Sequence, residues 1–105
     1  MNNILTKLNS VLKDRKNKDP EESYVASLYK KGLDHTCNKI EEEANELVNA
    51  LENENKERVI SEAADLWFHS LVALSMKNLS SDDILNELDK RFGISGHEEK
   101  NNRNA

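Results

Sequence analysis

Apolar residues recur at helical spacing along most of this chain. A first apolar stripe falls within residues 3–15, and the strongest falls within residues 56–76, where apolar side chains cover most of the helix circumference. Spacings of three and four residues place side chains on one face of an α-helix. The pattern therefore predicts helices, and it predicts that the helix at 56–76 lies at the centre of the fold or at a subunit interface.

Residues typical of helix ends divide this pattern into separate elements. Gly32 and Gly93 follow apolar-periodic segments, and glycine is the residue that most often ends a helix. Ser80 and Asp83 have the spacing of a capping pair ahead of a further apolar stripe. We therefore expect a second helix that ends at Gly32 and a fifth that begins after Ser80 and ends at Gly93.

The start of the second helix has two candidates. Asp19-Pro20 combines an N-cap residue with proline at the first helical position, whereas Ser23 is a rival N-cap. The third helix is expected to begin near Asp34, and the polar stretch at 52–57 predicts the turn into the fourth. A short turn of this kind makes the third and fourth helices antiparallel neighbours.

Composition favours a small helical bundle. The chain has 105 residues, of which 36% are hydrophobic, and it contains only three glycines and one proline. Such a chain has little apolar surface to bury on its own, and sharing apolar faces with a second copy would make up the deficit. We therefore predict an all-α bundle of four to five helices over residues 1–95, completed by homodimerisation, with a polar tail at 96–105.

The charge balance and the single cysteine exclude several classes of protein. A net charge of −5 argues against nucleic-acid binding, which needs a basic surface. The sequence has no apolar run long enough to cross a membrane and no signal-peptide pattern, so a cytoplasmic location is the default expectation. Cys37 cannot form an internal disulfide, and it is expected to be a small core residue of the third helix.

Two pairs of acids dominate the candidate chemistry. Glu43 and Glu46 fall in the third predicted helix, and Glu62 and Asp65 fall in the fourth, each pair spaced i, i+3 on one helical face. Facing carboxylates repel unless a cation lies between them, and hard oxygen ligands suit Mg²⁺ or Mn²⁺. Solvent-exposed acids on helix surfaces are the alternative, but Glu62 and Asp65 occur in the most apolar helix of the chain. The sequence predicts a divalent-metal site that handles phosphates.

Several basic residues are candidates for binding the phosphates themselves. Lys39 precedes Glu43 by one helical turn and can reach an anion from the same face, although it can equally form an intrahelical ion pair with Glu43. Arg15 and Arg91 are further candidates, and no glycine-rich phosphate loop is present. His69, one turn beyond Asp65, can bind a phosphate, orient an acid, or serve as an ordinary core histidine.

The acid pattern resembles that of a known superfamily. Glu42-Glu43-x-x-Glu46 followed by Glu62-x-x-Asp65 is similar to the signature of the all-α nucleoside-triphosphate pyrophosphatases. Over nearly its full length, the chain resembles the phosphoribosyl-ATP pyrophosphohydrolase family of histidine biosynthesis. The runs that carry this closer resemblance are Ser23-Tyr24-Val25-Ala26, Lys39-Ile40-Glu41-Glu42-Glu43-Ala44-Asn45-Glu46, Glu62-Ala63-Ala64-Asp65-Leu66-Trp67-Phe68-His69 and Gly93-Ile94-Ser95-Gly96.

The resemblance implies an activity and assigns roles. It implies Mg²⁺-dependent hydrolysis of phosphoribosyl-ATP to phosphoribosyl-AMP and pyrophosphate by a homodimer. Glu42 becomes the candidate water-activating base, the two acid pairs become the metal ligands, and Lys39, Arg15, Arg91 and His69 become candidate substrate contacts. The chain departs from the family pattern at Glu41, at Val25, where the family has threonine, and at Trp67-Phe68.

Two other functions remain open at this stage. A pyrophosphatase that removes free or non-standard nucleotides would have the same acid pairs and different base and sugar contacts. A non-enzymatic helical interaction module would have solvated acid faces and no response to Mg²⁺. Turnover of phosphoribosyl-ATP compared with dCTP and dUTP separates the first alternative, and the effect of EDTA separates the second.

Overall fold

The chain folds into helices throughout the part that can be described. The computed structural model describes residues 3–93, and within that range every regular element is an α-helix. The helices are α1 (Ile4–Arg15), α2 (Tyr24–Lys31), α3 (Leu33–Asn53), α4 (Lys56–Met76) and α5 (Ser81–Phe92). The predicted all-α fold class is confirmed. The expected tail at 96–105 and the last two residues of the expected domain lie outside the described residues.

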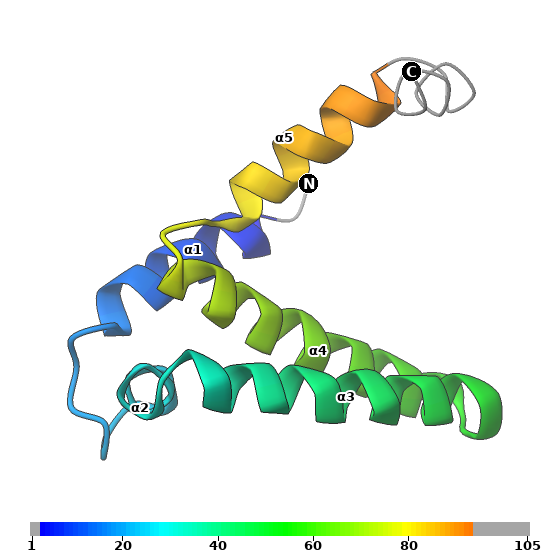
Figure 1. Cartoon of the computed structure of the whole chain (residues 1–105). Helices are drawn as coiled ribbons and strands as arrows, with labels where there is room; N and C mark the ends of the chain where they lie inside the picture. Colours follow the sequence, from blue (N-terminus) through cyan, green and yellow to red (C-terminus); the bar gives the residue numbers. More distant parts are fainter. Residues whose placement is uncertain (1–2, 94–105) are drawn as a thin grey trace.

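The two long helices form an antiparallel hairpin around which the others are arranged. α3 and α4 run side by side, α2 crosses the open end of the hairpin, and α5 leads away from it (Figure 1). The hairpin turn is short because Glu54 ends α3 and Asn55 caps α4, with the Asn55 side chain accepting a hydrogen bond from the Arg58 backbone N–H at 3.0 Å. The acid pairs of α3 and α4 are therefore carried on neighbouring helices.

The observed helix ends can be compared with the capping residues predicted from the sequence. Gly32 separates α2 from α3 at a φ of 96°, a conformation that favours glycine. Ser80 and Asp83 form the predicted capping box of α5. Of the two candidate starts for α2, Ser23 is the N-cap, because its Oγ accepts from the Ala26 N–H. Asp19 instead accepts from the Glu21 N–H in a turn, so the helix start at Asp19-Pro20 is wrong.

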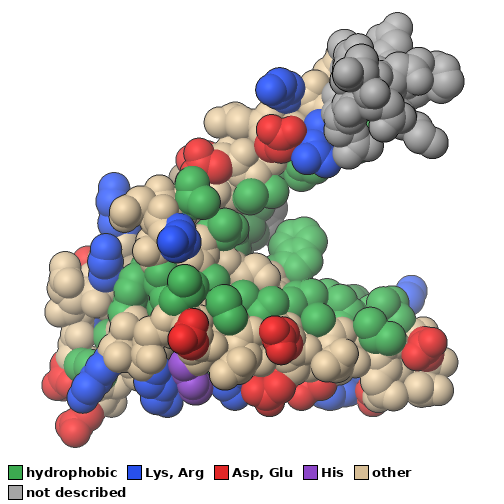
Figure 2. All heavy atoms as spheres, in the orientation of Figure 1, with side chains coloured by type: hydrophobic (Ala, Val, Ile, Leu, Met, Phe, Trp, Pro, Cys, Tyr) green, Lys and Arg blue, Asp and Glu red, His purple; other side chains and the backbone are tan. Residues whose placement is uncertain are grey.

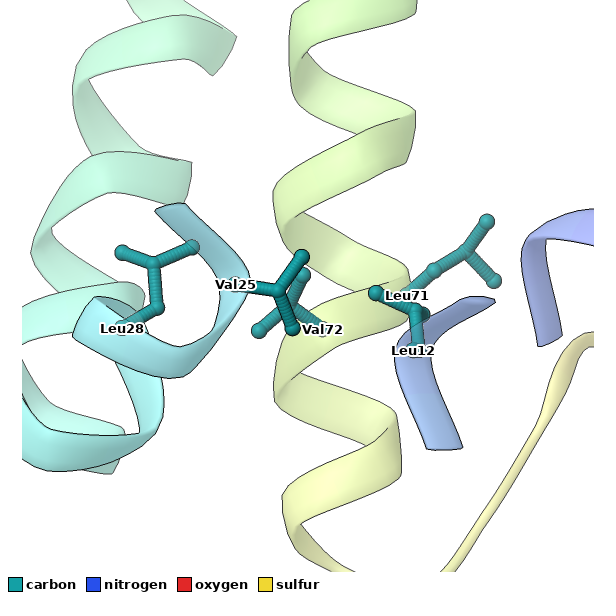
Figure 3. Packing of buried hydrophobic residues seen from close by; sticks show 5 residues of the cluster. All are labelled: Leu12, Val25, Leu28, Leu71 and Val72. Carbon is teal, nitrogen blue, oxygen red and sulfur yellow. The ribbon is translucent and has the colours of Figure 1, made fainter. Parts of the chain in front are cut away.

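A small apolar core joins α1 and α2 to α4. Five buried side chains form it: Leu12, Val25, Leu28, Leu71 and Val72 (Figure 3). α4 contributes two of them and contacts α1, α2 and α3, which confirms its predicted central position. The departure from the family pattern at Val25 concerns this core, because Val25 is only 4% exposed.

Cys37 does not belong to the core. Its side chain is exposed, whereas the preceding residue, Thr36, is fully buried and its Oγ1 donates a hydrogen bond to the Gly32 carbonyl at 3.4 Å. The prediction of a buried cysteine is wrong, because the position of α3 that becomes buried is the preceding one, Thr36.

A large apolar face lies beyond this core. Val48, Leu51, Ile60 and Trp67 on the hairpin are 53–63% exposed, and we call these four residues the uncovered apolar face. α5 exposes a further apolar row, consisting of Ile84, Leu85, Leu88 and Phe92. Figure 2 shows hydrophobic side chains along the hairpin and on the side of α5 that faces it. No helix within residues 3–93 combines the length and apolar character that a bilayer-spanning segment needs.

Candidate active site

The four predicted metal ligands come together along the hairpin in two pairs that cross between the helices. Glu43 on α3 is close enough to Asp65 on α4 for the Asp65 charge to raise its pKa, and Glu46 faces Glu62 in the same way. Glu62 is buried and Glu43 is largely buried, whereas Glu46 and Asp65 are exposed. Each pair therefore combines one inner carboxylate, buried or largely buried (Glu62 or Glu43), with one outer, exposed carboxylate (Glu46 or Asp65).

Glu62 is a buried acid with one free oxygen. Its Oε1 accepts a hydrogen bond from Arg58 Nη2, one turn earlier on α4, whereas its Oε2 is buried without a hydrogen-bond partner. Hydrogen bonding with Glu46, burial and the Glu46 charge raise the pKa of Glu62 above its ordinary value, and the Arg58 charge partly opposes them. Such a bond between two carboxyls forms only when one of them is protonated. With both carboxylates ionised, Glu62 Oε2 has no hydrogen-bond partner.

Glu43 lies against a buried histidine, His69. Its Oε1 lies 2.7 Å from His69 Nδ1, and only 12% of its side chain is exposed. Burial raises the pKa of Glu43, and the negative charge of Asp65 adds to this, while His69 and the Lys39 charge lower it. Oε1 nevertheless has no well-aligned hydrogen bond, because the nearby N–H points towards another acceptor, the Asp65 carbonyl, at 3.1 Å from Nδ1.

The chemistry of this donor set suits a hard divalent cation. Two inner carboxylates each present a buried oxygen that lacks a hydrogen bond, and each faces an outer carboxylate of the same charge. A buried, unpartnered carboxylate oxygen is strongly unfavourable, and a cation is the partner that removes both the desolvation and the repulsion. Within residues 3–93, no three of these side chains converge tightly enough to form a ready-made ligand cluster. The residues fit Mg²⁺ by charge and burial.

A shallow cavity adjoins the acids. It has a volume of about 300 Å³ and is lined by residues of both long helices: Asn45, Glu46, Asn49, Glu54, Arg58 and Glu62. A larger hollow of about 530 Å³ is bounded by α1, α2, α4 and the segment around Ser80, and its lining includes none of the four acids. The smaller cavity therefore includes two of the four predicted metal ligands, Glu46 and Glu62, in its lining.

The predicted catalytic base, Glu42, and the predicted substrate contacts are placed unequally. Lys39, half-buried on α3, and His69 lie beside Glu43, whereas Glu42 is exposed on the same helix. Arg15 is exposed at the end of α1. Arg91 forms a 2.9 Å ion pair with Glu87 on α5, which carries it away from the hairpin (Figure 1).

Two residues of this site were missed at the level of sequence. Arg58 precedes Glu62 by four residues, a spacing that predicts an ion pair on a helix and could have identified it. The Tyr24 hydroxyl on α2 is hydrogen-bonded to His69 across 45 positions of sequence, and helical periodicity carries no signal for such a contact.

Comparison with known proteins places the chain in a family. A family model described as phosphoribosyl-ATP pyrophosphohydrolase matches residues 5–92. A phosphoribosyl-ATP pyrophosphatase of Hydrogenovibrio crunogenus is 55% identical over 106 aligned residues, which cover 97% of this chain and 94% of that protein. Proteins of the same name from Vesicomyosocius okutanii, 47% identical with 99% of both chains covered, and Methylococcus capsulatus, 48% identical with 95% of both covered, are also similar. The chain therefore belongs to the phosphoribosyl-ATP pyrophosphohydrolase family.

Proposed function

We propose that this protein hydrolyses phosphoribosyl-ATP to phosphoribosyl-AMP and pyrophosphate, the second step of histidine biosynthesis, in the cytoplasm. One water is consumed and the bond between the α and β phosphates is broken. The buried, unpartnered Oε2 of Glu62 is the observation that supports this reaction best, because a chain of this family has a reason to keep such a group only where a cation and its phosphates bind.

We assign Mg²⁺, or Mn²⁺ in its place, to Glu43, Glu46, Glu62 and Asp65. The bound cation supplies neutralisation of the triphosphate charge. Glu42, exposed one position before Glu43, is the proposed acceptor of the proton of the attacking water. Lys39 is the proposed phosphate contact closest to the acids, and Arg15 and Arg91 are further proposed contacts. Arg58 bonds one oxygen of Glu62, and its charge opposes the rise in the pKa of that carboxyl.

We also propose that the protein works as a homodimer. The uncovered apolar face on α3 and α4 and the apolar row on α5 leave eight large apolar side chains at least 44% exposed. Large exposed apolar patches mark interaction surfaces. A second copy of the chain supplies an equivalent face, as a two-fold interface requires.

A pyrophosphate-release assay tests the reaction. Phosphoribosyl-ATP, dCTP and dUTP are offered in parallel with Mg²⁺ or with EDTA. We expect release from phosphoribosyl-ATP only with Mg²⁺, and loss of that release in Glu62→Gln and Asp65→Asn while circular dichroism stays helical. Glu52→Gln, which changes an exposed acid of α3 outside the site, is the matched control and should keep full activity. Preferential turnover of dCTP or dUTP, or full activity of the two site variants, would contradict the proposal.

A further inference from the structure

A chain of polar contacts links α2 to the acids of the hairpin. Tyr24, the first residue of α2, places its hydroxyl 2.8 Å from His69 Nε2 on α4. The other ring nitrogen, Nδ1, lies 2.7 Å from Glu43 Oε1 on α3. His69 is 6% exposed, so its ring lies between two partners with little access to water. Three helices therefore meet at one imidazole.

The partners of His69 assign its tautomer. Nδ1 faces the Asp65 carbonyl oxygen at 3.1 Å as well as the Glu43 carboxylate, and both of these oxygens accept hydrogen bonds. Nδ1 therefore carries the proton. In the neutral ring Nε2 is then an acceptor, and the Tyr24 hydroxyl is the donor that satisfies it.

The ring is also fixed in its plane. The Tyr24 and His69 rings meet edge to face with centroids 5.7 Å apart, and Phe68 meets His69 in the same way at 5.1 Å. A rotated imidazole would lose its hydrogen bonds at both ends. The ring consequently presents its Nδ1–H at one place, directed at the Asp65 carbonyl and next to Glu43 Oε1.

We propose that Tyr24 and His69 are positioning residues that hold the Glu43 carboxylate in the orientation needed to bind a divalent cation. The Tyr24 hydroxyl fixes the tautomer and plane of His69, and the Nδ1 edge of the ring, 2.7 Å from Glu43 Oε1, limits where that carboxylate can lie. Neither residue needs to touch the substrate. The inference rests on the proposed function, since it takes Glu43 to be a metal ligand.

Three substitutions separate the two ends of this chain of contacts. Tyr24→Phe removes only the hydroxyl. His69→Asn places an amide nitrogen near the position of Nδ1, and His69→Gln places one near the position of Nε2. Tyr29→Phe is the matched control, because the Tyr29 hydroxyl is hydrogen-bonded to Ser75 Oγ in the larger hollow, whose lining includes none of the four acids.

The test is Mn²⁺ binding without nucleotide, measured by electron paramagnetic resonance, alongside thermal melts. We expect His69→Gln to weaken Mn²⁺ binding about 10- to 100-fold, the range found when a group that orients a metal ligand is lost. His69→Asn should bind more tightly than His69→Gln, Tyr24→Phe should weaken binding by several-fold, and Tyr29→Phe should match the wild type. Tyr24→Phe should also need more Mg²⁺ for half-maximal activity, with kcat recovered at saturating Mg²⁺.

Several results would overturn the inference. Wild-type Mn²⁺ affinity in Tyr24→Phe, or equal weakening in Tyr24→Phe and Tyr29→Phe, would reduce Tyr24 to a structural role. If the His69 variants do not fold, the comparison of Tyr24→Phe with Tyr29→Phe decides. Failure of the wild-type protein to bind Mn²⁺ would instead refute the proposed metal site, and the inference with it, whereas normal wild-type binding with unaffected variants would refute the inference alone.

Discussion

Trp67 should become buried when two copies of the chain associate. It is the only tryptophan in the sequence, it lies on the uncovered apolar face, and 62% of it is exposed in the single chain. Removing its ring by Trp67→Ala should therefore weaken the proposed dimer more than it weakens the fold of each protomer.

The structure sets the size of this effect. A tryptophan side chain offers up to about 250 Å² of accessible surface, so 62% exposure leaves about 150 Å² available for an interface. At about 25 cal/mol per Å², full burial is worth up to about 4 kcal/mol per protomer. Interface tryptophans that act as hot spots cost at least about 2 kcal/mol when truncated, which is about 30-fold in the dissociation constant.

Sedimentation equilibrium over a range of concentrations measures the dissociation constant of the dimer, and the fluorescence emission of the single tryptophan reports its burial. We expect wild-type emission to shift to longer wavelength as the protein is diluted and the dimer dissociates. Trp67→Phe keeps most of the ring area and should dissociate far less than Trp67→Ala. A wild-type protein that is monomeric at micromolar concentration, or a Trp67→Ala variant that dimerises as tightly as the wild type, would refute the reasoning.

Three further predictions follow from burial and charge. Leu28→Ala, at a fully buried core position, should lower the free energy of unfolding by about 2–5 kcal/mol in urea titrations, and a loss below 1 kcal/mol would contradict the core described here. Arg58→Gln should weaken Mn²⁺ binding at pH 6 more than at pH 8, because the loss of its charge raises the pKa of Glu62 further; equal weakening at both pH values would argue against this. Burial raises the pKa of Glu43, and hydrogen bonding with Glu46 raises that of Glu62, both above 4.5. The folded chain therefore binds more protons than the unfolded chain just above pH 4.5, so these two groups lower Tm in EDTA as pH rises through that window. Glu62→Gln should make this fall shallower, and an unchanged slope would be inconsistent with the prediction.

The sequence predicted those parts of the fold that depend on near neighbours. The capping box of Ser80 and Asp83 and the glycine end at Gly32 need only a few adjacent residues to form, and both are present. The prediction failed where neighbouring elements decide the outcome. Cys37 lies on a helical stripe that the sequence shows correctly as apolar, but the packing of α2 and α4 determines which side of α3 is covered, and Thr36 occupies that side.

In the candidate site, too, the sequence predicted the features that depend on local spacing and missed those that depend on packing between helices. The i, i+3 acid pairs predicted that carboxylates of α3 and α4 would face each other, and the hairpin brings them together. The spacing could not predict which residues contact these carboxylates or which of the carboxylates are buried. The contact from Tyr24 to His69 depends on how α2 crosses the hairpin, and the burial of Glu62 against the exposure of Asp65 depends on the rotation of α4 about its axis.

A crystal grown with Mn²⁺ tests the central claim most directly. The account predicts an anomalous difference peak between α3 and α4, with oxygens of Glu43, Glu46, Glu62 and Asp65 around it at about 2.0–2.1 Å, by analogy with Mg²⁺. Side chains that remain apart in solvent with no anomalous peak between the helices would contradict it.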